Sequence, residues 1–130
     1  MNPSVRKTRV LVVDDDPVVL ELVSGWLSDA GYAVEVRDSA LGTAQQVASD
    51  QPDVVLLDVM MPALSGGELA QLIRRHHRTA LASVILHSSL APAELEQLVV
   101  KTGALGGLQK THDAARFVAS FDRLVATARH

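Results

Sequence analysis

The sequence predicts an α/β fold: one domain built on a doubly wound, parallel five-stranded sheet. Apolar runs typical of buried strands alternate along the chain with segments in which apolar residues recur at helical spacing. The central run, residues 54–57, is apolar without alternation, as expected for a strand buried on both faces. With 130 residues the chain is long enough for one domain and short for two. Residues 1–8 are expected to be a flexible leader and residues 9–130 the domain.

Composition excludes several classes of protein. Hydrophobic residues make up 48% of the chain, enough for a packed core. There is no cysteine, which excludes disulfides and thiolate metal sites and fits a cytoplasmic protein. The formal net charge of −3 gives no reason to expect direct nucleic-acid binding. No apolar run approaches the length of a membrane span, so no membrane association is expected.

The first strand and helix are predicted at residues 10–13 and from Pro17 to Gly31. Asp16 is placed to cap the helix and Pro17 to be its first residue, while Gly31 is suited to its end. The spacing predicts one buried helix face, made of Val19, Leu22, Val23, Trp26, Leu27 and Ala30.

The second strand is predicted at residues 33–36, followed by a helix that Asp38 or Ser39 caps. Pro52 ends that connection, and the central strand covers residues 53–58. The inward residues of the helix are expected to be Leu41, Ala44, Val47 and Ala48.

The second half of the chain continues the alternation. A capping box, Ser65 with Glu68, predicts a third helix that ends in the basic run 74–78. Strands are predicted at residues 83–87 and 105–109, and helices from Pro92 to Gly103 and after Asp113. The apolar faces of these three helices are Leu69, Leu72 and Ile73, then Leu95, Leu98 and Val99, then Phe117, Val118, Phe121, Leu124 and Val125.

Polar side chains stand where four of the predicted strands end. In an open α/β sheet these ends meet at one edge, which brings together Asp14, Asp15, Asp58, Ser88 and Lys110. Two carboxylates about 4 Å apart repel by roughly 1–4 kcal/mol, so a hard cation such as Mg²⁺ is expected among them. An aspartate nucleophile, a metal, a lysine and a hydroxyl are the parts that phosphoryl transfer needs. Asp58 alone would equally fit a loop-capping aspartate.

Four motifs together resemble the receiver domain of response regulators in two-component signalling, over nearly the whole chain. They are VVDDDP at residues 12–17, PDVVLLDVMMP at 52–62 with Ser65 and Gly66, VILHSS at 84–89, and the segment 103–110 that ends in Lys110. The resemblance implies a flavodoxin-like (βα)5 fold with strand order 2-1-3-4-5.

The resemblance also implies a role for each residue of the constellation. Asp58 accepts a phosphoryl group from a histidine kinase or a histidine phosphotransfer protein. Asp15, Asp58 and the backbone carbonyl of Met60 bind Mg²⁺, and Asp14 assists, through water. Ser88 reaches the phosphoryl group after modification, and Lys110 pairs with it.

The chain departs from the family at a few positions. Gly107 stands where the family often has an aromatic residue, and Thr111 where proline commonly follows the lysine. His87 occupies a strand position that is normally apolar; it is expected to be a buried, neutral histidine. Met60 and Leu90 stand where the family tunes hydrolysis of the acyl phosphate. Neither side chain can hydrogen-bond an attacking water, which predicts slow autodephosphorylation.

The resulting hypothesis is a phosphorylatable signalling switch rather than a turnover enzyme. A stand-alone receiver is expected, acting on a downstream protein through the fourth helix, fifth strand and fifth helix of the predicted fold. The alternatives are the receiver part of a larger regulator and a degenerate receiver that binds without phosphorylation. A dehalogenase-like phosphatase is disfavoured, because that family has a second aspartate where Met60 stands.

Overall fold

The computed structural model describes residues 6–60 and 83–128, which form a parallel five-stranded sheet with the order β2-β1-β3-β4-β5. The strands are β1 (Arg9–Val13), β2 (Ala33–Arg37), β3 (Val54–Asp58), β4 (Ser83–Ser88) and β5 (Gly106–Gln109). The helices are α1 (Pro17–Asp29), α2 (Thr43–Asp50), α4 (Pro92–Thr102) and α5 (Ala114–Ala128). The predicted fold class and strand order are confirmed. The third predicted helix, with its basic end, lies outside the described residues.

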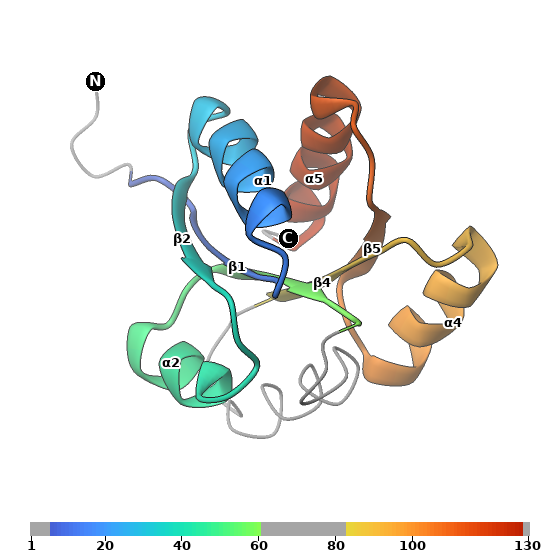
Figure 1. The fold of residues 1–130 in the computed structure, drawn as a ribbon, viewed down its shortest axis with the longest axis horizontal. Helices are drawn as coiled ribbons and strands as arrows, with labels where there is room; N and C mark the ends of the chain where they lie inside the picture. The colour runs from blue at the N-terminus through green and yellow to red at the C-terminus, as the bar shows by residue number, and fades with distance from the viewer. Residues whose placement is uncertain (1–5, 61–82, 129–130) are drawn as a thin grey trace.

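Helices cover both faces of the sheet. Helices α1 and α5 pack on one face, and α2 and α4 on the other (Figure 1). Within β3, alternate residues feed the two cores: Val55 and Leu57 join the α2 and α4 side, while Val54 and Leu56 join the α1 and α5 side. A strand with helices on both faces has no solvent face, which explains its continuous apolar run. None of the described helices is long and apolar enough to cross a membrane.

Helix α1 begins as the sequence predicts. The Val18 N–H donates to the Asp16 carboxylate at 2.9 Å, and Pro17 is the first helical residue. Gly31 follows the helix with φ +100°, a left-handed conformation that favours glycine. Two residues of the expected buried face are exposed, Leu22 at 42% and Ala30 at the helix end. The buried stripe is narrower, because α1 packs through Leu20, Val23 and Leu27.

The predicted start of α2 is wrong. Neither Asp38 nor Ser39 caps the helix, which begins at Thr43 after Gly42 in a left-handed conformation. The Arg37 side chain explains this, because it donates to the carbonyl groups of Ser39 and Leu41 and holds these residues in a turn. Consequently the side chain of Leu41, expected to face the core, is 72% exposed.

A further residue expected inside is also exposed. Ala48 lies on the outer side of α2. In the edge strand β2, Val36 is 49% exposed.

Strand β5 forms despite its two glycines, because helices occupy the space above and below it. A Cβ added to Gly107 would lie 2.7 Å from Cγ of Leu95 in α4, and one added to Gly106 would lie 2.7 Å from Cδ2 of Leu124 in α5. The glycines therefore let both helices approach the edge of the sheet closely. The Lys110–Thr111 peptide bond that follows is trans.

Candidate functional site

Three aspartates meet at the carboxyl edge of the sheet. Asp14 follows β1, Asp15 comes next in the chain, and Asp58 ends the central strand β3. One carboxylate oxygen from each lies within 4.8 Å of the others. Asp14 and Asp58 are buried, and Asp15 is exposed. The first and third strands thus bring together the acidic residues that the sequence predicted to be neighbours.

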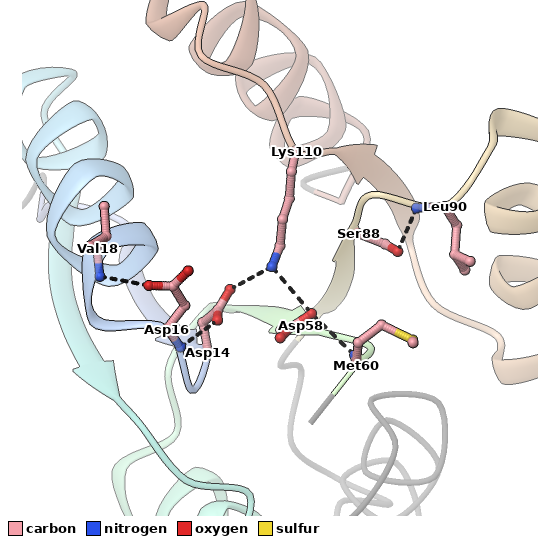
Figure 2. A network of polar contacts seen from close by, with 8 residues as sticks. All are labelled: Asp14, Asp16, Val18, Asp58, Met60, Ser88, Leu90 and Lys110. Carbon is pink, nitrogen blue, oxygen red and sulfur yellow. Dashed lines mark hydrogen bonds and ion pairs between the residues drawn. The ribbon is translucent and has the colours of Figure 1, made fainter. Parts of the chain in front are cut away.

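Lys110 reaches into this cluster from the end of β5. Its Nζ lies 3.2 Å from Oδ2 of Asp14 and 3.5 Å from Oδ1 of Asp58 (Figure 2). Burial by itself would lower the pKa of the Lys110 ammonium, but the carboxylates of Asp14 and Asp58 outweigh it and hold the pKa above its usual value. The lysine is therefore a fixed cation at neutral pH.

Local hydrogen bonds orient the carboxylates. The N–H of Asp16 donates to Oδ1 of Asp14 at 2.9 Å, and the N–H of Met60 donates to Oδ1 of Asp58 at 3.1 Å (Figure 2). Both are bonds from the residue two positions on, which short aspartate side chains make readily. The same Asp58 oxygen faces Lys110, so Oδ2 is the Asp58 oxygen without these contacts.

Asp58 is electrostatically unfavourable as a carboxylate. Burial raises the pKa of its carboxyl, and the charges of Asp14 and Asp15 raise it further, while the Met60 N–H and Lys110 offset part of this. A cation beside Asp58 would reverse the balance by favouring the ionised form.

The acidic cluster fits a divalent cation. Oδ2 of Asp14 is buried and, within the described residues, accepts no hydrogen bond; the nearby Lys110 ammonium forms only an ion pair with it. Three carboxylates with one incompletely satisfied oxygen match the all-oxygen ligand sets of hard cations. Asp14, Asp15 and Asp58 are therefore the residues able to hold a metal ion.

Ser88 lies at the same edge, and within the described residues its hydroxyl makes no hydrogen bond to the aspartates. Its side chain is fully buried, and its Oγ accepts the N–H of Leu90 at 3.0 Å (Figure 2). Its carbonyl accepts the N–H of Lys110 at 2.7 Å, which ties the ends of β4 and β5 together. Met60, whose carbonyl was predicted as a ligand, contributes its N–H to Asp58, and its side chain is 65% exposed.

Two residues that support the site were not found from the sequence. The Arg37 carbonyl accepts the N–H of Asp14 at 3.1 Å, and the Gln109 side chain donates to the carbonyl of Leu90 at 3.0 Å. The first contact joins two backbone atoms, so the identities of the residues do not indicate it. The second could only have been suspected from the position of Gln109 directly before Lys110.

We expect Asp58→Asn to stabilise the fold in metal-free buffer near neutral pH, by about 1 kcal/mol. The folded pKa of Asp58 exceeds its usual value of 3.8, so the folded protein binds this proton more readily than the unfolded chain does. The free energy of unfolding of the wild type therefore rises as the pH falls through the folded pKa. The ionised group therefore destabilises the fold at neutral pH.

Urea unfolding with and without Mg²⁺ measures the effect, and Mg²⁺ should stabilise the wild type more than the variant. Asp29→Asn, at the exposed end of α1, is the control. An Asp58→Asn variant less stable than wild type without metal would contradict this account.

Comparison with known proteins agrees with this geometry. A parallel sheet in the order 2-1-3-4-5 with an acidic cluster and a lysine at its carboxyl edge defines the class of doubly wound domains with a ligand site at the switch point. The family model for the response regulator receiver domain matches residues 10–122. The chain therefore belongs to the response regulator receiver domain family.

Individual relatives fall within the same family. The chain is 31% identical over 122 residues to the nitrogen assimilation regulatory protein NtrX of Azorhizobium caulinodans, covering 92% of this chain and 26% of that protein. It is 31% identical over 129 residues to the DNA-binding dual master transcriptional regulator RpaA of Synechocystis, covering 94% of this chain and 54% of that one. The chain thus spans about a quarter to a half of these curated relatives.

Solved structures show the same fold. Chemotaxis protein CheY4 of Vibrio cholerae is 26% identical with a TM-score of 0.80, covering 92% of this chain and 99% of that one. A response regulator from Chloroflexus aurantiacus is 26% identical with a TM-score of 0.83, covering 93% and 99%.

Proposed function

We propose that this chain is a phosphoacceptor switch in two-component signalling, in which Asp58 is the residue that accepts the phosphoryl group. The observation that carries the proposal is the position of Asp58: a buried carboxylate at the end of the central strand, between an acidic cluster and the Lys110 ammonium. The donor is the phosphohistidine of a histidine kinase or of a histidine phosphotransfer protein.

The two carboxylate oxygens of Asp58 have different contacts, which determines the one that attacks in phosphoryl transfer. Oδ1 is held by the Met60 N–H and faces Lys110, which leaves Oδ2 as the nucleophile. This oxygen forms a bond to phosphorus while the phosphorus–nitrogen bond of the phosphohistidine breaks, and the departing imidazole takes up a proton. Lys110 supplies positive charge to the phosphoryl oxygens, and Ser88 a hydroxyl donor once its side chain turns from Leu90.

Asp15 and Asp58, with the backbone carbonyl of Met60, are the proposed ligands of Mg²⁺, and Asp14 assists through water. When bound, this ion neutralises charge on the acidic cluster and on the transferred phosphoryl group. Asp14, which is buried with one incompletely satisfied oxygen, keeps the cluster negative enough to attract the ion.

Incubation with acetyl phosphate and Mg²⁺, followed by intact-mass measurement, tests the proposal. Wild-type protein should gain the mass of one phosphoryl group, and Asp58→Asn should gain none. Asp29→Asn, an exposed aspartate at the end of α1, should label as wild type does. A folded protein that neither labels nor binds a beryllofluoride mimic would instead be a receiver that acts by binding alone.

We expect the phosphorylated protein to lose its phosphoryl group slowly. Met60 follows the acceptor closely and is 65% exposed, but its thioether cannot orient an attacking water. Met60→Gln should therefore speed the loss severalfold, whereas Met60→Leu should leave it near the wild-type rate. Intact mass over time after removal of the donor measures both. A wild-type lifetime of seconds would contradict the expectation.

The switch acts through protein contacts of the surface formed by α4, β5 and α5, either as a separate protein or as the receiver part of a longer regulator. The relatives NtrX and RpaA are longer proteins, which supports the second arrangement.

A further inference from the structure

We propose that Arg37 is a positioning residue for the metal site, because its guanidinium fixes the backbone group that holds Asp14. Arg37 is the last residue of β2 and lies beside the end of β1. It acts through Asp14 and does not itself contact the ion. Its effect on Mg²⁺ binding rests on the proposed function, whereas its effect on Asp14 does not, so the two are measured separately.

The link between Arg37 and Asp14 is a backbone hydrogen bond at the carboxyl edge of the sheet. The N–H of Asp14 donates to the Arg37 carbonyl at 3.1 Å. β1 ends at Val13, which is the register partner of Arg37. The bond therefore extends the pairing of β1 with β2 by one step and holds the first residue outside the strand.

The placement of two acidic residues depends on this bond. The carboxylate of Asp14 is oriented by the Asp16 N–H at 2.9 Å and by Nζ of Lys110 at 3.2 Å (Figure 2). These contacts turn the side chain once the backbone is in place. Asp15 follows directly, and within residues 6–60 and 83–128 its exposed carboxylate accepts no hydrogen bond. Its position is therefore set by the backbone alone.

The Arg37 guanidinium binds the segment that follows Arg37 in the chain. Its Nε donates to the carbonyl of Ser39 at 3.2 Å, and its Nη1 donates to the side-chain oxygen of Gln46 at 2.7 Å. Its Nη2 donates to the carbonyl of Leu41. One side chain thus ties the turn before α2, and the first turn of α2 itself, to the end of β2.

The turn determines the direction of the Arg37 carbonyl. That carbonyl belongs to the planar peptide unit that joins Arg37 to Asp38, so its direction is set by the dihedral angles on either side of the unit. Because Ser39 and Leu41 are bound to the Arg37 side chain, the backbone cannot leave this conformation without breaking those bonds. The guanidinium therefore holds the acceptor of the Asp14 N–H in place.

Neighbouring residues show that the turn is built around the guanidinium. A Cβ added to Gly42 would lie 2.7 Å from Nη2 of Arg37, so glycine leaves the room that this side chain occupies. The hydroxyl of the fully buried Thr43 donates at 2.7 Å to the Ser39 carbonyl, which also accepts from Arg37. A buried hydroxyl and a glycine thus support the same arrangement.

The partners of the guanidinium indicate a geometric role and not charge neutralisation. All three are neutral oxygens, and within the described residues Arg37 forms no ion pair. Arginine suits this role because its donors form a rigid planar fork, whereas lysine carries a compact charge. The two roles predict opposite signs. Loss of a positive charge near an acidic cluster would strengthen Mg²⁺ binding, whereas loss of positioning weakens it.

The choice of ion provides a second distinction. Mg²⁺ requires a nearly ideal octahedral set of oxygens, whereas Ca²⁺ accepts a flexible set of varying number. A loosened segment of Asp14 and Asp15 should therefore lose affinity for Mg²⁺ more than affinity for Ca²⁺. A general loss of stability would lower both affinities alike.

Hydrogen exchange in the metal-free protein tests whether Arg37 holds Asp14. In Arg37→Met and in Arg37→Lys, we expect the Asp14 amide to exchange about tenfold faster relative to the amide of Leu105. The Leu105 N–H donates to the Val84 carbonyl at 2.8 Å on the other side of the sheet, so it reports general loosening. Neither metal nor phosphoryl donor is present, so this result is independent of the proposed function.

Titration of the isotope-labelled protein with Mg²⁺ or Ca²⁺ at constant ionic strength, followed by NMR, tests the effect on the metal site. Arg37→Met and Arg37→Lys should both bind Mg²⁺ about tenfold more weakly than wild type. Their affinity for Ca²⁺ should fall by less than about threefold. Lysine keeps the charge and loses the fork, so it should resemble methionine and not arginine at this position.

Arg9 provides a matched control at the opposite end of α2. Its Nη1 donates to the carbonyls of Asp50 at 2.7 Å and Gln51 at 3.4 Å. Arg9→Met therefore also removes an arginine that binds backbone beside α2, but at the start of β1 and away from Asp14. It should leave the relative exchange of Asp14 and the preference between the two ions at their wild-type values.

Three outcomes would overturn the proposal. One is unchanged relative exchange of Asp14 in both Arg37 variants, each folded by thermal melting. Another is tighter Mg²⁺ binding by Arg37→Met with wild-type binding by Arg37→Lys, which would assign Arg37 a role through charge. The third is an equal loss of Mg²⁺ and Ca²⁺ affinity in Arg37→Met and Arg9→Met, which would reduce the effect to the stability of α2. Wild-type protein that binds neither ion would refute the metal site of the proposed function, and the exchange result would stand.

Discussion

Acidification from about pH 7.5 to about pH 4 is expected to cost the fold about 3 kcal/mol through His87 alone. The side chain of His87 is 3% exposed, and its ring lies edge-on to Phe117 with the centroids 5.4 Å apart. Burial, and to a lesser degree the charge of Lys110, lower the pKa of His87 from 6.5 to about 4. The histidine is therefore neutral in the folded protein at neutral pH.

The sign of the effect follows from which state binds the proton. Between the unfolded pKa of 6.5 and the folded pKa of about 4, the unfolded chain is protonated at His87 and the folded protein is not. The stability from the neutral, buried ring is thus fully present above pH 6.5 and is lost as the pH falls through that range.

Urea unfolding at several pH values, for wild type and His87→Leu, measures this contribution. Leucine keeps the site apolar and removes the proton, so the stability difference between the two proteins should shift by about 2 kcal/mol in favour of the variant between about pH 7.5 and about pH 5. Raised-pKa groups such as Asp58 contribute with the opposite sign, but they are common to both proteins and cancel in the difference. His112→Leu, at an exposed histidine, controls for the exchange of histidine for leucine itself. If the free energy of unfolding changed with pH in the same way in wild type and His87→Leu, His87 would not be the source of the pH dependence.

The constellation at the sheet edge was predictable because strand ends fix it. Asp14 and Lys110 each follow a strand directly, and Asp58 is the last residue of one. In a parallel sheet those ends converge whatever the details of the loops. The environment of His87 was likewise predictable from its place in an otherwise apolar strand. Apolar runs and strand ends are local features of the sequence, and the topology then places them together.

The start of α2 and the orientation of Ser88 could not be predicted in the same way. Both depend on contacts between a side chain and a distant or irregular backbone segment. Arg37 reorganises the turn before α2 by binding two carbonyl groups, which overrides the capping preference of Asp38 and Ser39. The Ser88 hydroxyl accepts the N–H of Leu90 instead of lying toward Asp58. Residue types reveal which groups can bond, but not which of several partners they meet.

The replacement of an aromatic residue by Gly107 also has a consequence that only the packing reveals. Position 107 is not an empty hole, because Leu95 of α4 occupies the space beside the glycine. A Cβ on residue 107 would meet three atoms of Leu95, namely Cγ at 2.7 Å, Cδ1 at 3.0 Å and Cδ2 at 3.1 Å. Since the nearest atom is the branch point of a side chain only 4% exposed, no simple rotation of Leu95 clears the contact. Helix α4 therefore packs so closely on β5 that only glycine fits at position 107 without a shift of the helix.

We accordingly expect Gly107→Ala to destabilise the fold by about 2 kcal/mol, whereas a strain-free Gly→Ala change commonly stabilises by about 0.4–1 kcal/mol. Gly106→Ala is the matched control. Its nearest contacts are the terminal methyl groups of Leu124, at 2.7 and 2.9 Å, and that half-buried side chain can move, so its cost should be smaller. Leu95→Ala alone should cost about 2–3 kcal/mol as a core truncation.

The double variant Gly107→Ala with Leu95→Ala separates steric conflict from a general intolerance of β5 to side chains. If Leu95 is the obstacle, the double variant should lose less stability than the sum of the losses in the two single variants. The difference, the coupling energy, should be about 1–2 kcal/mol by urea unfolding. If the losses of stability were strictly additive, alanine at position 107 would disturb the strand itself, and its contact with Leu95 would not be the cause. Coupling of the expected sign would show that α4 and β5 are fitted to each other through one glycine and one leucine. An aromatic side chain could then enter this position only if α4 moved.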